Sequence, residues 1–340
     1  MPSVDRISVV VPVFNAVGTL RTAIDSLEVE QLPEVEVVAV NDGSTDGSAA
    51  LLDALSDLRP WLRVLHRTHA GIVSALNAGI SAATGSLIAR MDADDRSLPG
   101  RLHRQRDFLR AHREIGLVAG RVRFGGHPLR ARGYAQYVRW INSLGSPDDI
   151  AMMRFVESPF AHPAVMFRRE LIDHHGGYHD GTFPEDYELW LRWMDAGVRM
   201  ASIPDEVLLW SDPPNRLSRS DPRYTIDAFY RMKSTYLARW LQHRTSFWPQ
   251  VIVWGAGRTT RQRARHLIVQ GARVRAWVDI DPEKIGHRVQ GVPVIAPQDL
   301  PAPGTAIILS YVGNRSARTE IMQWLRENGY ELGRDYIPVA

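Results

Sequence analysis

The first hundred residues alternate between apolar runs and amphipathic segments, and this alternation defines the predicted elements. The apolar runs predict strands over residues 7–14, 35–40, 62–67 and 86–91. The amphipathic segments between them predict helices over residues 16–30, 46–58 and 71–84. The first run is β-branched almost throughout, as expected of a strand that is buried on both faces. This series predicts a mostly parallel sheet with helices on both faces.

The alternation becomes less regular after residue 95. We expect the segment 120–165 to be irregular and aromatic, and the stretch 211–223 to be rich in turns. The helical segments of this region are predicted at 97–113, 186–197 and 224–241. The pattern then restarts as strand, glycine turn, helix and strand, with a further strand at 305–312 and a helix at 316–329.

This restart indicates two α/β domains. We place the boundary near residue 245, after a linking helix at about 224–243. The larger predicted domain covers residues 1–245 and the smaller, Rossmann-like domain covers residues 246–340. A chain of 340 residues is long enough to give each domain its own core.

Composition excludes several classes of function. The hydrophobic fraction of 44% and the charged fraction of 23% are those of an ordinary globular protein. The net charge is only +3 and the arginines are spread along the chain, so no nucleic-acid partner is expected. Cysteine is absent, which excludes disulfides and thiolate metal sites. The sequence shows neither a signal peptide nor an apolar run long enough to span a bilayer, so we expect a cytoplasmic protein.

Polar side chains follow the predicted strands, at the edge where ligands bind to parallel sheets. Asn15 follows the first strand, Asp42 the second, and Asp92, Asp94 and Asp95 the fourth. Residues two apart in an extended segment point the same way, so Asp92 and Asp94 are expected to face one site with Asp95 turned aside. Carboxylates in one site favour Mg²⁺ or Mn²⁺ together with a diphosphate. The alternative is that Asp95 or Ser97 caps the following helix and the other acids are solvated.

A second acidic pair, Glu185 and Asp186, stands at the start of a predicted helix. One explanation is stabilisation of the helix N-terminus by negative charge. The functional explanation is a general base, because the flanking Phe183 and Tyr187 favour a raised carboxyl pKa.

Four segments occur in an order and spacing that resemble the family 2 glycosyltransferases, which have the nucleotide-sugar-binding GT-A fold. The segments are VVVPVFNAVGTLRTAIDSL (9–27), VVAVNDGSTDGS (37–48), NAGISAATGSLIARMDADD (77–95) and FPEDYELWLRWMDAG (183–197). The resemblance covers roughly residues 5–220, and the fold class it implies is a GT-A α/β domain followed by the Rossmann-like one.

The resemblance implies an inverting transfer from a nucleotide diphospho-sugar, usually a UDP-sugar. It implies that Asp42 meets the base, that Asp94 holds the metal together with Asp92, and that Asp186 is the catalytic base. The residues that it implies around the nucleotide and the donor are Pro12, Val13, Asn15, Asp42, Asn77, Arg90, Asp92 and Ala93.

The implied acceptor is a glycan or lipid-linked molecule in the synthesis of a cell-surface polysaccharide or glycoconjugate. Such an acceptor would be met at the inner face of the membrane, where the arginine-rich segment 101–113 would touch anionic lipid or form a solvated helix face. His162 would line the acceptor side or pack as a structural histidine.

Two positions depart from the family pattern. Ala16 stands where related sequences often carry an acid, and Pro213 stands where they often carry a histidine. The second departure leaves Arg216 or Arg219 as a diphosphate contact, with surface arginine as the alternative.

The C-terminal unit carries an incomplete dinucleotide fingerprint. Gly255, Gly257 and Asp279 stand where NAD or another nucleotide would bind, but the third glycine position is Thr260. This degenerate motif favours a docking or interaction module over nucleotide binding.

Two rival functions stay open beside the glycosyltransferase. An NAD(P)-dependent oxidoreductase acting through the C-terminal unit would leave the acids of the first domain unexplained. A scaffold protein with a lapsed transferase domain is disfavoured because Asp94 and Asp186 are both present. The glycosyltransferase is therefore the leading hypothesis.

Overall fold

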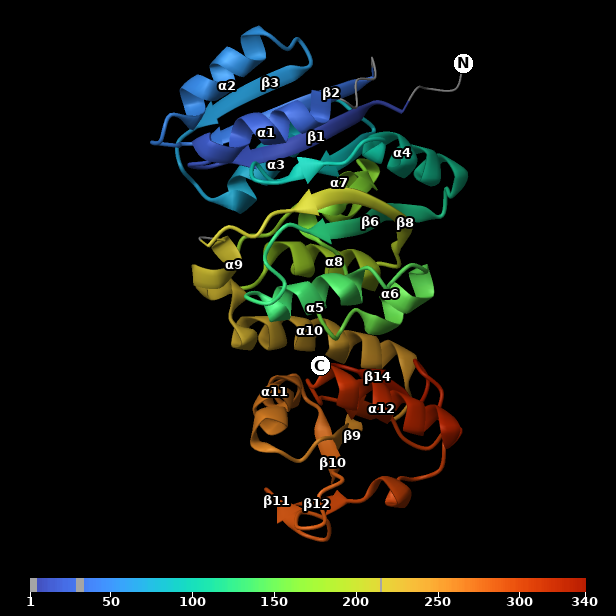
Figure 1. The fold of residues 1–340 in the computed structure, drawn as a ribbon. Coiled ribbons are helices and arrows are strands. Elements are labelled where there is room, and N and C mark those ends of the chain that lie inside the picture. Colours follow the sequence, from blue (N-terminus) through green and yellow to red (C-terminus); the bar gives the residue numbers. More distant parts are fainter. Residues whose placement is uncertain (1–4, 29–33, 215) are drawn as a thin grey trace. The chain divides into compact units, whose positions relative to one another are not determined.

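A computed structural model describes residues 5–28, 34–214 and 216–340. The end of the helix predicted over 16–30 and Asn215 of the predicted turn-rich stretch lie outside these residues. The chain divides into two compact units (Figure 1). The first comprises the chain up to Ile150, Pro159–Gly181 and Glu185–Ser220, and the second comprises Ala151–Ser158, Thr182–Pro184 and Asp221–Ala340.

The first unit contains an eight-stranded sheet in the order β3-β2-β1-β4-β7-β6-β8-β5. Strands β3, β2, β1 and β4 are parallel, β7 is antiparallel to both neighbours, β6 and β8 are parallel, and β5 is antiparallel to β8. The mostly parallel sheet is thus confirmed. The strands are β1 (Ile7–Val13), β2 (Val35–Asp42), β3 (Leu62–Arg67), β4 (Leu87–Arg90), β5 (Arg96–Ser97), β6 (Ile115–Phe124), β7 (Met166–Arg168) and β8 (Arg199–Trp210).

Helices cover both faces of this sheet, as predicted, because alternate strand residues are apolar on both sides. Val9 and Val11 belong to a core shared with apolar residues of α1, α2, α4 and α5. Val10 and Val40 face α3, whose Gly79 has no room for a side chain against them. The helices are α1 (Val17–Glu28), α2 (Ser48–Asp57), α3 (Ile72–Ala82), α4 (Arg101–Ala111), α5 (Arg132–Ile141), α6 (Pro147–Met153), α7 (Glu170–His175), α8 (Glu185–Asp195) and α9 (Leu217–Ser220).

The segment predicted to be irregular, 120–165, is more regular than expected. It contains the end of β6 together with α5 and α6. Helix α5 buries Ala135, Val138 and Ile141, an amphipathic spacing that the intervening aromatic residues obscure in the sequence. Strand β8 was also not predicted, because Pro204 interrupts its apolar pattern near the register shift between β6 and β8.

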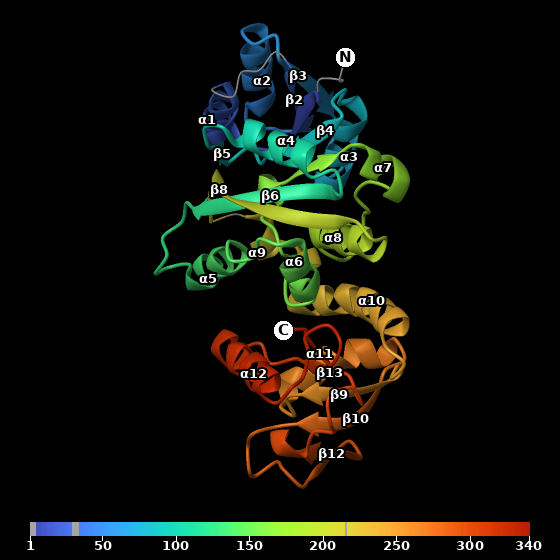
Figure 2. The same ribbon diagram turned by 90° about the vertical axis from the view of Figure 1, so that its right-hand side faces the viewer.

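The second unit contains a six-stranded sheet in the order β11-β12-β10-β9-β13-β14, in which all pairs except β11 with β12 are parallel (Figure 2). The helix predicted at about 224–243 is α10, which is grouped with this unit. The elements are α10 (Ile226–Arg244), β9 (Gln250–Trp254), α11 (Arg258–Val269), β10 (Arg273–Val278), β11 (Arg288–Val289), β12 (Val292–Ile295), β13 (Ile308–Ser310), α12 (Arg315–Glu327) and β14 (Tyr336–Pro338).

Lys233 ties three parts of the second unit together. Its ammonium group on α10 donates hydrogen bonds to the carbonyl oxygens of Phe155 (2.9 Å), Val156 (3.1 Å) and Val339 (2.6 Å). The side chain is buried, so these carbonyls replace the water that the charge loses. One lysine thus anchors residues 151–158 and the chain end to α10.

Candidate active site

The acids after β4 form one cluster. One carboxylate oxygen from each of Asp92, Asp94 and Asp95 lies within 4.8 Å of the others. Arg90, buried at the end of β4, places its guanidinium 2.5 Å from the carboxylate of Asp92. The cluster therefore has an arginine on one flank, while two of its three acids have no such close cation in the described part of the chain.

Asp95 joins the cluster, so the expectation that it turns aside is wrong. Residues 93 and 94 form a turn in which the N–H of Asp95 donates to the carbonyl of Asp92, and the two-residue period of an extended strand does not apply. Asp95 also does not cap the next helix, because α4 begins after Gly100. One of its carboxylate oxygens instead accepts from the N–H of Ser211 at 2.8 Å.

Burial and mutual repulsion raise the pKa values of two acids of the cluster. Burial, together with Asp92, raises the pKa of Asp94 to about 6. Burial, Asp92 and Asp94 raise the pKa of Asp95 well above its usual range. The second oxygen of Asp95 is shielded from solvent and has no hydrogen-bond partner among the described residues. Oxygen ligands at this spacing, one of them buried and unpaired, fit a divalent metal ion held by Asp92, Asp94 and Asp95.

Of the neighbouring cations, Arg216 has the largest effect on the pKa of Asp94. Its positive charge lowers the pKa of Asp94 against the burial that raises it. The guanidinium stacks 4.2 Å above the ring of Trp210 and lies 3.7 Å from Asp212. Arg219 instead pairs with Asp212 at 2.7 Å. Of the two arginines considered for the diphosphate, the structure therefore brings Arg216 toward the acid cluster.

The loops after β1 and β2 are tied together at the same sheet edge. Asn15, in a left-handed conformation with φ 50°, accepts the N–H of Thr45 at 2.8 Å and donates its own N–H to Ser44 at 3.0 Å. Asp42 accepts the N–H groups of Ala70 (3.0 Å) and Gly71 (2.9 Å), which fixes the turn before α3. Asn15 and Asp42 thus shape this edge.

Three further residues expected around the nucleotide lie in or beside the strands of this edge. Pro12 and Val13 end β1, opposite Val40 and Asn41 of β2, and Val13 is buried. Ala93 is buried between two acids of the cluster. Their contribution to a nucleotide site would be shape, since none offers a polar side chain.

Phe14 is a residue at this edge that the sequence did not single out. Its ring stacks on His69 at 4.2 Å between centroids, and the residue is 47% exposed. The sequence offers little indication of a functional role, because a phenylalanine at the end of a strand is usually a buried core residue. An exposed aromatic face beside the Asn15 and Asp42 loops is suited to stack on a planar base.

Asp186 occupies the first turn of α8. Burial and the adjacent Glu185 carboxylate together raise the pKa of its carboxyl to about 7, against the N–H of Tyr187 and the charge of Arg90, which lower it. Asp186 accepts the N–H of Tyr187 at 2.7 Å, as an acid at a helix N-terminus does, but burial has the larger effect on its pKa. A carboxyl with a pKa near neutral has the property that a general base requires.

Tyr178 is buried where the charges of both Arg90 and Asp186 act on its hydroxyl. Asn77 fixes the backbone of Tyr178, accepting its N–H at 3.0 Å and donating to its carbonyl at 2.8 Å. The Tyr178 hydroxyl lies 2.7 Å from Nε2 of the buried His162. Burial and the charge of Arg90 hold the pKa of His162 well below its usual range, so this histidine is neutral and packed. Asn77 and His162 both position Tyr178.

Arg90 is the link between the two acidic groups. It pairs with Asp92, and its charge also acts on Asp186, Tyr178 and His162. The acid cluster and the candidate base therefore belong to one electrostatic site.

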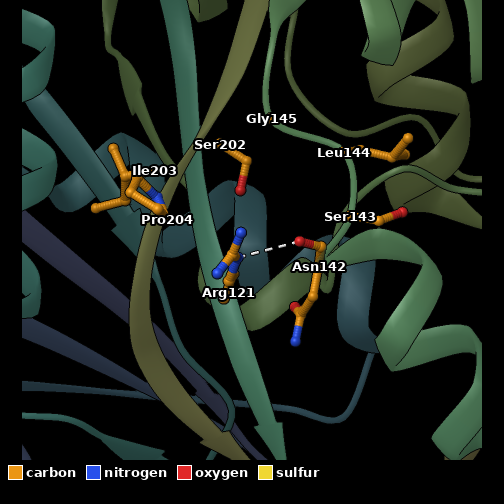
Figure 3. Close-up of a pocket in the computed structure, with 8 residues that line it drawn as sticks. All are labelled: Arg121, Asn142, Ser143, Leu144, Gly145, Ser202, Ile203 and Pro204. Atoms are coloured by element: carbon orange, nitrogen blue, oxygen red, sulfur yellow. Dashed lines mark hydrogen bonds between the residues drawn. The ribbon is translucent and has the colours of Figure 1, made fainter.

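A hollow of about 160 Å³ in the first unit has none of the predicted site residues in its lining (Figure 3). Its wall is structural, since Asn142 bonds both the N–H and the carbonyl of Val122, and Arg121 donates to the carbonyl of Asn142. The hollow is lined by Arg121, Asn142, Ser143, Leu144, Gly145, Ser202, Ile203 and Pro204.

Helix α4, considered for membrane contact, uses part of its charge internally. Arg101 is fully buried and donates to the carbonyl of Arg90 at 2.7 Å, and Arg106 pairs with Glu34 at 2.8 Å. Within the described residues, no helix combines the length and the apolar character needed to cross a bilayer.

The fold and the site define an α/β enzyme with an acidic centre at the carboxyl ends of its strands, and comparisons place it further. The model of the family described as Glycosyl transferase family 2 matches residues 8–176. The amylovoran biosynthesis glycosyltransferase AmsE of Erwinia amylovora is 32% identical over 205 residues, which cover 59% of this chain and 74% of AmsE. The chain belongs to glycosyltransferase family 2.

Solved structures confirm the GT-A-like fold. S. aureus TarS 1–349 in complex with UDP-GlcNAc matches with a TM-score of 0.56 and 18% identity, over 69% of this chain and 66% of TarS. The mannosyltransferase PcManGT from Pyrobaculum calidifontis, in complex with GDP-Man and Mn²⁺, matches with a TM-score of 0.51 and 21% identity, over 70% of this chain and 63% of PcManGT. The chain thus spans just under two thirds of each of these solved chains.

Proposed function

We propose that this chain moves a sugar from a uridine diphospho-sugar to a hydroxyl group of a glycan or lipid-linked acceptor, with inversion at the anomeric carbon. The observation that carries the proposal is the arrangement around Arg90. This one arginine pairs with Asp92 of the acid cluster and acts electrostatically on Asp186, whose pKa is about 7. A sugar transfer in one displacement needs both a diphosphate site and a catalytic base.

The donor half of the site is the edge formed by β1, β2 and β4. We propose that the uracil ring of the donor lies against the Asn15 and Asp42 loops and that Phe14 stacks on its face. The diphosphate lies toward Asp94, where Arg216 offers a positive charge. UDP-GlcNAc in TarS and GDP-Man in PcManGT support a nucleotide diphospho-sugar as donor.

Asp92, Asp94 and Asp95 would hold a divalent metal ion, which would supply positive charge to the diphosphate as it leaves. The raised pKa of Asp94 and the unpaired oxygen of Asp95 support this assignment, because a bound cation would offset both. The Mn²⁺ in the PcManGT complex is consistent with it.

Asp186 would act on the acceptor. Above pH 7 its carboxylate accepts the proton of the acceptor hydroxyl while that oxygen attacks the anomeric carbon from the face opposite the diphosphate. The bond to the diphosphate breaks as the new glycosidic bond forms, so a single displacement inverts the configuration. Tyr178, held by Asn77 and His162, lies within the electrostatic range of this carboxylate.

We also propose the biosynthetic process in which the reaction takes part. The relative AmsE is named for amylovoran biosynthesis, which supports a role in making a cell-surface polysaccharide or glycoconjugate.

The direct test is a screen of UDP-sugars with Mn²⁺ and lipid-linked acceptors, read by mass spectrometry of the product. We expect one UDP-sugar to give a product with inverted anomeric configuration by NMR. A product with retained configuration would contradict the role of Asp186 as base.

A further inference from the structure

The second unit has its own ligand edge. The chain runs from β9 to β10 on one side of the sheet and later to β13 on the other, so the strand order reverses between β9 and β13. Ligands of open parallel sheets bind outside the carboxyl ends of the strands at this point. Here the turn at Gly255 follows β9, and the segment 311–314 follows β13.

Two positions of the dinucleotide fingerprint at this edge are engaged by contacts within the protein. Thr260 packs its side chain against Gly255, where a Cβ would come within 2.7 Å of the threonine hydroxyl. Asp279, the expected ribose ligand, already accepts the N–H groups of Ala256 (3.1 Å) and Asp281 (3.0 Å). Asp279 is therefore engaged with the backbone of its own turn, and Thr260 stands where the fingerprint has its third glycine.

Three arginines gather at the same edge. The guanidinium of Arg263, from α11, lies against Gly313 after β13, and Arg315 and Arg318 come from the first turns of α12. Arg318 is 6% exposed. The acid that acts on this group is Glu157, 3.8 Å from Arg315. Three guanidinium groups against one carboxylate leave an excess of positive charge.

Part of this charge has no hydrogen-bond acceptor. Nε of Arg263 and Nη1 of Arg315 are shielded from solvent, and neither has a hydrogen-bond partner in the described ranges of the chain. The Arg263 guanidinium lies 5.1 Å from the centre of the Tyr230 ring, a contact that supplies no hydrogen-bond acceptor of that kind. Burial and the neighbouring Arg315 lower the pKa of Arg318, which shows that the arginines repel one another. Buried donors without acceptors cost free energy, and an anion would remove that cost.

The edge is also open to solution. Gly313 and Asn314 are exposed, and Arg315 keeps 34% of its side chain exposed. Asn314 caps α12 by accepting the N–H of Ala317 at 3.0 Å, so the positive end of a 13-residue helix points to the same place.

We propose that the second unit binds a phosphate group of a small phosphorylated molecule between Arg263, Arg315 and Arg318. Guanidinium groups bind phosphate oxygens in pairs, which suits the fork geometry of Arg315 and the buried Arg318. This site is separate from the proposed donor site and does not depend on it.

Inorganic phosphate is the probe for the test. It is titrated by calorimetry into the full chain carrying Asp94→Asn, with EDTA present, so that metal at the acid cluster cannot hold it. We expect binding that is weakened at least about tenfold by Arg315→Gln together with Arg318→Gln, the loss of about 1.4 kcal/mol. Arg275→Gln, an exposed arginine on β10, is the matched control and should bind as before.

Folding is controlled separately. Phosphate should raise the melting temperature of the unsubstituted chain but not of the double variant, and Arg315→Lys should weaken binding while keeping the charge. A lipid source of phosphate is distinguished by vesicles of phosphatidylcholine with phosphatidic acid, to which the chain should not bind more tightly than to free phosphate. Absence of phosphate binding, equal binding by the double variant and Arg275→Gln, or binding to the vesicles alone would overturn the proposal.

Discussion

The two sheets of this chain end in opposite charges. At the carboxyl edge of the first sheet stand Asp92, Asp94 and Asp95, within 4.8 Å of one another. At the corresponding edge of the second sheet stand Arg263, Arg315 and Arg318, with Glu157 as their acidic neighbour. Both edges follow parallel strands at the position where α/β proteins bind ligands.

The difference shows that the fold sets where a ligand binds and the side chains set what it is. Carboxylates accumulate negative charge and require a cation before a diphosphate can approach. Arginines accumulate positive charge and can bind an anion without a metal. Burial, together with the like charge of a neighbour, raises the pKa of Asp94 at one edge and lowers the pKa of Arg318 at the other.

The largest expected effect is on the base of the first site. Asp186→Asn keeps the shape of α8 but cannot accept a proton, so transfer should fall about 10²- to 10⁴-fold. Binding of UDP with Mn²⁺ should stay within about threefold of the unsubstituted chain, because Asp186 acts on the acceptor. Single-turnover rates and calorimetry measure the two effects. Near-full turnover by Asp186→Asn would show that another group takes the proton.

The acid cluster gives the next effect. Asp94→Asn should weaken metal-dependent UDP binding about 100-fold, since a metal ligand is lost. In metal-free buffer the same change should stabilise the chain by about 1–3 kcal/mol at pH 7. Folding raises the pKa of Asp94 from its ordinary value to about 6, so the protein loses stability as the pH rises through this window. Thermal unfolding with EDTA at pH 4.5 and pH 7 measures this sign, and a lower melting temperature for Asp94→Asn at pH 7 would contradict it.

The second unit is expected to depend on Lys233 in a different way. Lys233→Met leaves three buried carbonyl oxygens without a donor and should cost about 2–4 kcal/mol of the free energy of unfolding. The matched control is Lys284→Met, because Lys284 is the other lysine of the chain and its side chain is 43% exposed. It should cost less than about 1 kcal/mol. Equal losses in denaturant unfolding of the two variants would remove the anchoring role of Lys233.

The smallest and most gradual expected effect is the fall of the transfer rate as the pH is lowered. Protonation of Asp186, whose pKa is about 7, removes the base, so the transfer rate should fall about tenfold per pH unit well below that pKa. The rate at saturating donor and acceptor, followed from pH 5 to pH 9, shows this limb. A flat profile across pH 6 to 8 would place the base elsewhere.

Much of the first unit could be predicted because its strands are read directly from apolar runs. The four strands from Ile7 to Arg90 and the helices between them lie within a few residues of their predicted places. Helix α5 and strand β8 were missed, since aromatic residues at 134, 137 and 140 and Pro204 obscure their periods. Local pattern fails where packing against another element decides the structure.

The site was predictable at the positions that sit in motifs. Asp92, Asp94 and Asp186 follow strand and helix signals, but the geometry of Asp95 depends on the N–H of Ser211, 116 residues further along the chain. Tyr178 depends on Asn77, 101 residues away. The cluster of Arg263, Arg315 and Arg318 left no local motif, because two helices bring it together.

The measurement that tests the central claim most directly is calorimetric titration of the full chain with UDP, with and without Mn²⁺. We expect binding that requires the metal and disappears in Asp94→Asn. NAD⁺ is titrated in parallel and should give no heat. UDP binding that is equally strong without metal, or NAD⁺ binding in place of UDP binding, would contradict a metal-bound nucleotide diphosphate at Asp92, Asp94 and Asp95.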